Sequence, residues 1–96
     1  MPAFVVVLAK IKNPEKLAEY SKAAGPIVAQ YGGKFTTRAP IVESLTKNAE
    51  FNRFVMIEFP NPDAPRTWYN SPEYQALIPL RDEGAEMIFS LVVPSE

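Results

Sequence analysis

Residues 3–17, which read AFVVVLAKIKNPEKL, decide the fold of this chain. Residues 3–11 are rich in β-branched side chains and show no helical period, which predicts a buried β-strand. Asn13 and Pro14 follow, and asparagine is a good helix N-cap while proline suits the first helical position. Downstream apolar residues recur at spacings of three and four, at Leu17, Tyr20, Ala24, Ile27 and Tyr31. The stretch therefore predicts a strand that leads directly into an amphipathic helix, whose apolar face continues beyond Pro26.

The same pattern returns half the chain length later. A second apolar run, residues 53–59, precedes Asn61-Pro62-Asp63, which matches Asn13-Pro14-Glu15. This match indicates two β-α-β halves, although any strand-to-helix turn favours residues of these types. The region 62–81 is predicted to be helical but interrupted, because prolines recur within it.

The remaining segments complete the element order. Gly32-Gly33 ends the first helix, and residues 34–45 alternate loosely around Pro40, which favours an edge strand with a bulge or break. Residues 46–52 are polar and predict a turn, and residues 86–93 predict the last strand. The order β-α-β-β-α-β predicts one α+β domain over residues 1–96, with the ferredoxin-like arrangement and a four-stranded antiparallel sheet.

Composition excludes several classes of function. The 96 residues include 10 Lys and Arg against 11 Asp and Glu, spread along the chain, so we expect no nucleic-acid partner. Cysteine and histidine are both absent, which excludes disulfides, thiolate nucleophiles, histidine-ligated haem and His-zinc sites. We therefore expect no cofactor and no metal site. The longest apolar run, residues 4–9, is too short to span a bilayer, so we expect no membrane association and a cytoplasmic location.

Both faces of the predicted sheet are apolar, which predicts a homodimer. Helices cover only one face of a two-layer domain, so the other face is normally polar. Here residues of opposite orientation are apolar on the first, third and fourth strands: Phe4, Val6 and Leu8 against Val5, Val7 and Ala9; Phe54 and Met56 against Val55, Ile57 and Phe59; Met87, Phe89 and Leu91 against Ile88 and Val92. A second copy packed sheet against sheet is the simplest cover, and loops folded over the face are the alternative.

Four residues could carry chemistry. Glu58 interrupts an apolar strand, and a buried carboxylate must be paired or protonated, so it is a candidate acid or base. The alternative for Glu58 is an ion pair at the rim. Arg38 and Arg81 could each clamp a substrate carboxylate, or could form salt bridges, for Arg81 with Asp82 or Glu83. Tyr74 could donate a hydrogen bond.

Trp68, Tyr69 and Tyr74 concentrate aromatic side chains in one short stretch. Such clusters pack in cores more often than they bind ligands, and both interpretations stay open here. Gly32-Gly33 lacks the pattern of a phosphate-binding loop and predicts only a helix end.

Three stretches resemble the family known as domain of unknown function 1330. They are residues 58–60 (Glu-Phe-Pro), residues 68–75 (Trp-Tyr-Asn-Ser-Pro-Glu-Tyr-Gln) and residues 79–81 (Pro-Leu-Arg), with support from residues 31–34 and Arg38. The resemblance implies a dimeric α+β barrel, and the sequence departs from it where Arg38 is followed by Ala-Pro instead of Gly-Gly. Relatives in the wider barrel group include cofactor-free monooxygenases, muconolactone isomerases and haem-using enzymes. The haem-using ones depend on a histidine that this chain lacks.

Two functions agree with these observations. The first is a metal- and haem-independent enzyme, of monooxygenase, isomerase or decarboxylase type, acting on a small organic acid or aromatic compound in a pocket between the sheet and its helices. Glu58 and Tyr74 would be catalytic, and Arg38, Arg81, Trp68 and Tyr69 would bind substrate. The second is a non-enzymatic homodimer that binds a metabolite or a partner protein.

Overall fold

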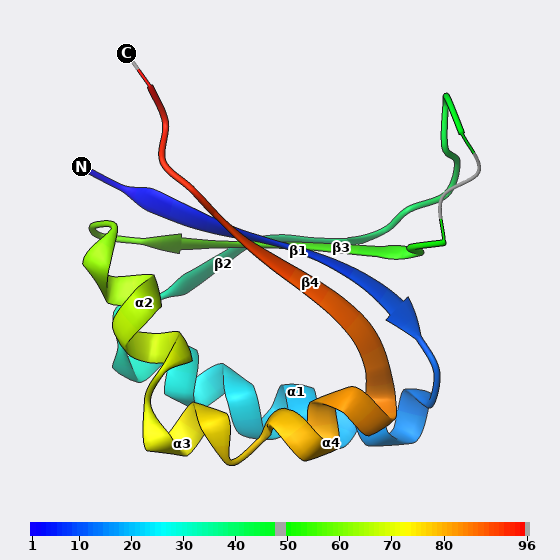
Figure 1. Cartoon of the computed structure of the whole chain (residues 1–96), viewed down its shortest axis with the longest axis horizontal. Helices are drawn as coiled ribbons and strands as arrows, with labels where there is room; N and C mark the ends of the chain where they lie inside the picture. The colour runs from blue at the N-terminus through cyan, green and yellow to red at the C-terminus, as the bar shows by residue number, and fades with distance from the viewer. Residues whose placement is uncertain (48–49, 96) are drawn as a thin grey trace.

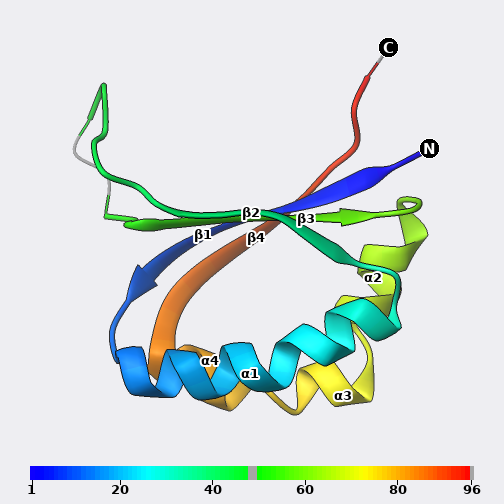
Figure 2. The ribbon, with the colours of Figure 1, turned by 180° about the vertical axis from the view of Figure 1, so that it is seen from behind.

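The computed structural model describes residues 1–47 and 50–95. Its elements are, in chain order, β1 (Ala3–Ile11), α1 (Pro14–Gln30), β2 (Lys34–Pro40), β3 (Arg53–Phe59), α2 (Asp63–Tyr69), α3 (Pro72–Gln75), α4 (Ile78–Gly84) and β4 (Ala85–Val92). The strands form one antiparallel sheet in the order β2-β3-β1-β4, and all four helices lie against one of its faces (Figures 1 and 2). This is the α+β, ferredoxin-like fold that the element order predicts.

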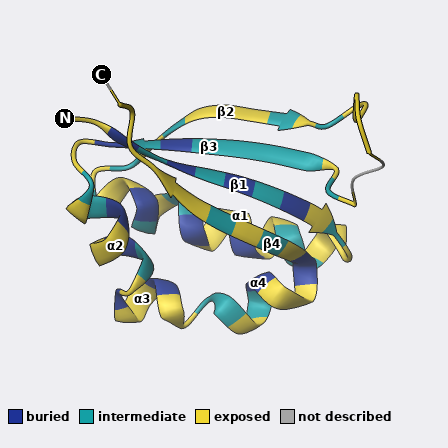
Figure 3. Ribbon diagram, turned by 45° about the horizontal axis from the view of Figure 1, so that its top comes forward, coloured by how far each residue is buried: buried dark blue, intermediate teal, exposed yellow. Residues whose placement is uncertain are grey.

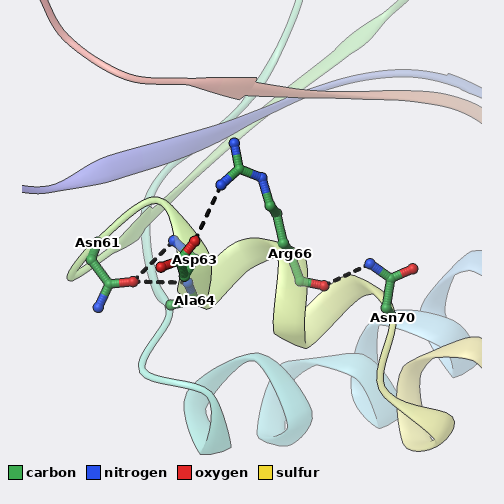
Figure 4. A network of polar contacts seen from close by, with 5 residues as sticks. All are labelled: Asn61, Asp63, Ala64, Arg66 and Asn70. Carbon is green, nitrogen blue, oxygen red and sulfur yellow. Dashed lines mark hydrogen bonds and ion pairs between the residues drawn. The ribbon is translucent and has the colours of Figure 1, made fainter.

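Equivalent asparagine caps begin the helical part of each half. In the first half, the Oδ1 atom of Asn13 accepts hydrogen bonds from the backbone N–H groups of Glu15 (3.1 Å) and Lys16 (3.2 Å). In the second half, the Oδ1 atom of Asn61 accepts from residues 63 (3.0 Å) and 64 (2.9 Å), as Figure 4 shows. Each cap satisfies two N–H groups that have no partner within the helix. The repeated Asn-Pro-acid sequence thus has the same local geometry in both halves.

Helix α1 supplies most of the helical side of the core. It continues through Pro26, as predicted, and its buried residues are Tyr20, Ala24 and Val28. Gly32 has a φ of +86°, a backbone conformation that favours glycine, and the chain turns there into β2. A Cβ atom on Gly33 would lie 2.5 Å from Cγ1 of Val28, so this turn packs directly against the core.

Strands β1 and β3 match their predicted bounds, whereas β2 is shorter than predicted. It ends at Pro40 instead of residue 45, and its pairing with β3 shifts register between Phe35 and Thr37. Beyond Pro40, Ile41 still donates its N–H to the carbonyl of Asn52, but no further strand pairing follows in the described residues. The predicted turn over residues 46–52 includes positions 48 and 49, which lie outside the described residues. Strand β4 begins and ends one residue earlier than predicted.

The sheet has one face toward the helices and one open face. Buried and half-buried residues alternate along β1 (Figure 3), and Val5, Val7 and Ile57 belong to the core. The open face carries a patch of seven apolar side chains on β1, β3 and β4: Phe4, Val6, Leu8, Phe54, Met56, Ile88 and Val92. Ile88 is 48 % exposed and Val92 is 42 % exposed. The pairing register therefore confirms that β1, β3 and β4 present apolar side chains on both faces of the sheet.

The described residues 41–47, after β2, and the described residues at both chain ends extend on the side of the open face (Figure 1). Val42 and Leu45, within residues 41–47, are almost fully exposed. Among the residues that the structure describes, no helix is long and apolar enough to cross a membrane.

Candidate functional site

A cavity of about 170 Å³ lies between the core face of the sheet and helix α1; we call it the first cavity. Its walls are mainly apolar, and its polar residues are two arginines, a tyrosine, a serine and a tryptophan. The lining residues are Val7, Ala9, Leu17, Tyr20, Ser21, Ala24, Val28, Phe35, Arg38, Arg53, Val55, Ile57, Trp68, Met87 and Phe89. None of them is acidic, so all formal charge at this cavity is positive.

Arg38 and Arg53 come from the neighbouring strands β2 and β3. Arg38 pairs with Val55 across the two strands, which directs both side chains to the core face, and its guanidinium lies 4.0 Å from the ring centroid of Phe35. Neither arginine forms an ion pair with a carboxylate among the described residues. The two guanidinium groups are therefore available to an anionic ligand.

A second cavity, of about 360 Å³, lies beside helices α2 and α4. Its polar lining residues are Arg66, Trp68, Tyr69, Asn70 and Arg81. Arg66 extends from α2 toward the sheet and pairs with Asp63 at 3.3 Å (Figure 4). Three residues, Trp68, Met87 and Phe89, line both cavities and so form the wall between them.

A chain of hydrogen bonds runs from the second cavity to the first. The NH1 group of Arg81 donates to the hydroxyl groups of Tyr69 (3.0 Å) and Tyr74 (3.2 Å). The hydroxyl of Tyr74 lies 2.7 Å from that of Tyr20, which lines the first cavity. Ser71 caps α3 by accepting from the backbone N–H of Tyr74 at 3.2 Å, and so fixes the position of this tyrosine.

Burial and hydrogen bonding together determine the protonation of the residues in this hydrogen-bond chain. Burial raises the pKa of Tyr20 well above its ordinary value, and the neighbouring Tyr74 raises it further. Burial also raises the pKa of Tyr74, against the lowering effect of its hydrogen bonds to Tyr20 and Arg81. For Arg81, burial alone lowers the pKa, but the hydrogen bonds to Tyr69 and Tyr74 leave it higher than usual. At neutral pH the two tyrosines are neutral and the arginine is charged.

Trp68 lies at the centre of the aromatic cluster and has one unused polar atom. Its ring centroid is 4.6 Å from that of Tyr74 and 5.6 Å from that of Phe59. The residue is only 1 % exposed, and its Nε1 atom is buried without a hydrogen-bond partner among the described residues. A buried donor without a partner costs about 1–3 kcal/mol, so an acceptor from a ligand or water is favoured here.

The structure separates the residues that the sequence assigns to one pocket. Glu58 pairs with Phe4 and Lys34 across the strands and belongs to the open face, so the sheet lies between it and Tyr74. The two predicted catalytic residues therefore do not share a site within one protomer. Arg81 and Tyr69 line the second cavity and not the first, and Arg81 forms the expected salt bridge with Asp82 at 3.2 Å.

Two other residues that the sequence assigns to the pocket line the same cavity. Arg38 and Trp68 both line the first cavity, and Trp68 and Tyr74 are fully packed in the core, as the structural interpretation of the aromatic stretch predicts. Sequence reasoning missed Tyr20, Ser21 and Arg53. The spacing of apolar residues places Tyr20 at a core position of α1 and predicts packing only. Arg53 lies near Arg38 because it pairs with Pro40 of the neighbouring strand.

The described residues contain no group of three or more acidic side chains placed to hold a metal ion.

The structural neighbours define the class of protein. A protein of unknown function from Rhodopseudomonas palustris matches with a TM-score of 0.78 and 18 % identity over 99 % of this chain and 83 % of its own. A dimeric ferredoxin-like protein of unknown function from Jannaschia sp. matches with a TM-score of 0.76 and 10 % identity, over 98 % of this chain and all of its own. The chain thus has the fold of the ferredoxin-like α+β proteins.

The family follows from the sequence. The family described as domain of unknown function (DUF1330) matches residues 2–94, and the chain belongs to it. A cofactor-independent oxygenase, SnoaB of Streptomyces nogalater, has a similar fold, with a TM-score of 0.70 and 14 % identity over 99 % of this chain and 94 % of its own. No functionally curated protein matches this sequence.

Proposed function

We propose that the protein is a homodimer that binds a small organic anion in the first cavity of each protomer. The observation that carries this proposal is the pairing of Arg38 and Arg53 with an apolar cavity that no acidic residue lines. Hydrogen bonds between charged groups are stronger than neutral ones, and guanidinium groups match carboxylates in shape. The ligand would place its carboxylate at the arginines and its apolar part among the core side chains.

The volume of the first cavity limits the size of the ligand. At about 170 Å³ it resembles engineered apolar cavities of roughly 150 Å³, which hold one benzene molecule. A single six-membered ring with one carboxylate matches these dimensions. Polycyclic compounds exceed them within one protomer.

The open face supports the homodimer. Three cross-strand rows of its patch lie side by side: Val92 and Phe4, Val6 and Met56, and Ile88, Leu8 and Phe54. Apolar patches of this kind mark interaction surfaces, and a two-fold partner presents the same patch in return. The charged pairs Lys10 with Glu86 and Lys34 with Glu58 flank these rows, where they suit the rim of an interface.

A second candidate function is metal- and haem-independent catalysis on the same ligand. The chain from Arg81 through Tyr74 to Tyr20 favours it, because it places a positive charge behind a hydroxyl group at the cavity. The cofactor-independent oxygenase with a similar fold supports this candidate by analogy only. Turnover of a bound acid, followed by mass spectrometry, would distinguish an enzyme from a binding protein.

Calorimetric titration with cyclohexanecarboxylate tests the proposed binding. We expect Arg38→Gln and Arg53→Gln each to weaken binding about tenfold or more, because a hydrogen bond to a charged group contributes roughly 1.5–3 kcal/mol. The matched control is Arg66→Gln, which removes an arginine that lines only the second cavity and is expected to leave the affinity unchanged. Equal binding of the neutral cyclohexanecarboxamide, or equal loss in the control, would argue against an anion site.

A further inference from the structure

Either of the two hydroxyl groups of Tyr74 and Tyr20 could donate to the other at 2.7 Å, and the surroundings of Tyr74 favour one direction. Tyr74 accepts a hydrogen bond from Arg81 and needs an acceptor for its own proton. Tyr74 is 0 % exposed and lines neither cavity, so the Tyr20 hydroxyl at 2.7 Å is the acceptor that the described residues offer. The reverse direction would leave the Tyr74 proton buried without a partner, at a cost of about 1–3 kcal/mol.

Tyr20 is therefore the last residue of this hydrogen-bond chain, and its hydroxyl proton is not used within the chain. Its oxygen accepts from Tyr74, and its own O–H group has no acceptor among the described residues. Tyr20 is 7 % exposed and lines the first cavity, where a bound molecule could supply the acceptor.

Trp68, which lines both cavities, carries a second donor without a partner among the described residues. Its ring and that of Tyr20 both pack against Tyr74, at centroid distances of 4.6 Å and 6.3 Å. The buried Nε1–H group has no acceptor in the described part of the chain. The two residues that carry these donors line the first cavity together with two arginines, and no carboxylate lines it.

We propose that Tyr20 and Trp68 donate hydrogen bonds to a carbonyl or enolate oxygen at the deep end of the bound acid. The ligand would then be a keto acid, with its carboxylate at Arg38 and Arg53 and its second oxygen at the two donors. This inference rests on the proposed anion site and specifies its substrate class.

The buried charge of Arg81 strengthens the proposed donors. Each hydrogen bond in a chain polarises the next, and donors in a site of low dielectric constant stabilise negative charge better than water does. Arg81 donates into this chain while its guanidinium lies 5.1 Å from the ring centroid of Phe89. The arrangement favours an oxygen that gains negative charge, as a ketone does when it becomes an enolate.

Nuclear magnetic resonance titration with two matched acids tests this proposal. The acids are 4-oxocyclohexanecarboxylate and cyclohexanecarboxylate, which differ only by a ketone oxygen that accepts but cannot donate. Trp68 is the single tryptophan, so the protein has one indole N–H resonance. We expect that resonance to move downfield with the keto acid alone, and the keto acid to bind about fivefold more tightly, which corresponds to one hydrogen bond of about 1 kcal/mol.

Tyr20→Phe should reduce this preference, because one of the two proposed donors is lost, while the plain acid binds as before. Tyr31→Phe is the matched control, because the Tyr31 hydroxyl donates to Glu73 at 3.0 Å and lines neither cavity. The wild-type titration needs no variant and so holds even if Tyr20→Phe fails to fold.

Equal affinity for the two acids, with an unmoved indole resonance, would overturn the proposed donors Tyr20 and Trp68. It would agree with the anion site at Arg38 and Arg53. Binding of neither acid would overturn both proposals. A preference of the same size in Tyr20→Phe as in the wild type would overturn the assignment of Tyr20.

Discussion

Arg81 is a buried cation whose partners are mostly neutral. Its guanidinium donates to Tyr69 and Tyr74, and its one carboxylate partner is the largely exposed Asp82. A buried charge is costly unless it is hydrogen-bonded, and here hydroxyl groups and the ring of Phe89 take the place of a buried carboxylate. The aromatic core therefore holds a positive charge beside the second cavity whose one carboxylate partner is largely exposed.

The two buried tyrosines predict a loss of stability in alkali. The pKa of Tyr20 and Tyr74 is raised above the ordinary value of 10.0, so the folded protein holds these protons more tightly than the unfolded chain. The stabilisation is complete below pH 10 and falls as the pH rises above it, by up to about 1.4 kcal/mol per tyrosine and pH unit. Urea unfolding between pH 9 and 11 should show this slope, and Tyr20→Phe should reduce it.

The absorbance of tyrosinate measures the ionisation of the tyrosines independently of the urea experiment. We expect Tyr20 and Tyr74 to ionise only as the protein unfolds. Ionisation of both near pH 10 in a protein that stays folded would contradict the buried chain of hydroxyl groups.

At the scale of elements, the end of α4 packs directly on the start of α1. The carbonyl of Gly84 accepts hydrogen bonds from the backbone N–H groups of Lys12 (2.9 Å) and Asn13 (3.0 Å). A Cβ atom on Gly84 would lie 2.7 Å from the backbone nitrogen of Leu17. The two halves of the chain therefore meet at a position where only glycine fits without movement of the backbone.

Gly84→Ala should lower the free energy of unfolding by about 1–3 kcal/mol, the usual cost of overpacking. Gly25→Ala is the matched control, because Gly25 lies within α1 and a Cβ atom there would meet nothing within 4 Å. In a helix that change should stabilise by up to about 1 kcal/mol. Urea unfolding of both variants would measure the difference, and similar effects would refute the close contact.

Short stretches of sequence predict the helices and strands, whereas the pairing of the strands determines their register and contacts. The caps at Asn13 and Asn61 and the strands β1 and β3 follow from short stretches of sequence, because capping and strand propensity act over a few residues. Pro40 predicts the break at which β2 ends, whereas the position of the bulge between Phe35 and Thr37 depends on how β2 pairs with β3.

The candidate site was predictable only in part for the same reason. Arg38, Trp68 and Tyr74 were identified by residue type, but which cavity each lines depends on the sheet register and on three short helices. The register separates Glu58 from Tyr74 and brings Arg53 to Arg38. Tyr20 gains its proposed role only through a contact across 54 residues of sequence.

At the scale of the whole molecule, the proposed homodimer predicts the effect of a charge on the open face. Val6 lies at its centre, opposite Met56 on one side and Ser90 on the other. Val6→Glu would place a charge in the interface, where a desolvated charge without a partner is strongly unfavourable. We expect this variant to be monomeric. Ala23→Glu, on an exposed position of α1, is the control and should keep the assembly of the wild type.

Sedimentation equilibrium of the wild-type chain at micromolar concentration tests the homodimer most directly. We expect twice the mass of one 10.7 kDa chain. A mass of one chain at that concentration would contradict the proposal that a second copy covers the open face.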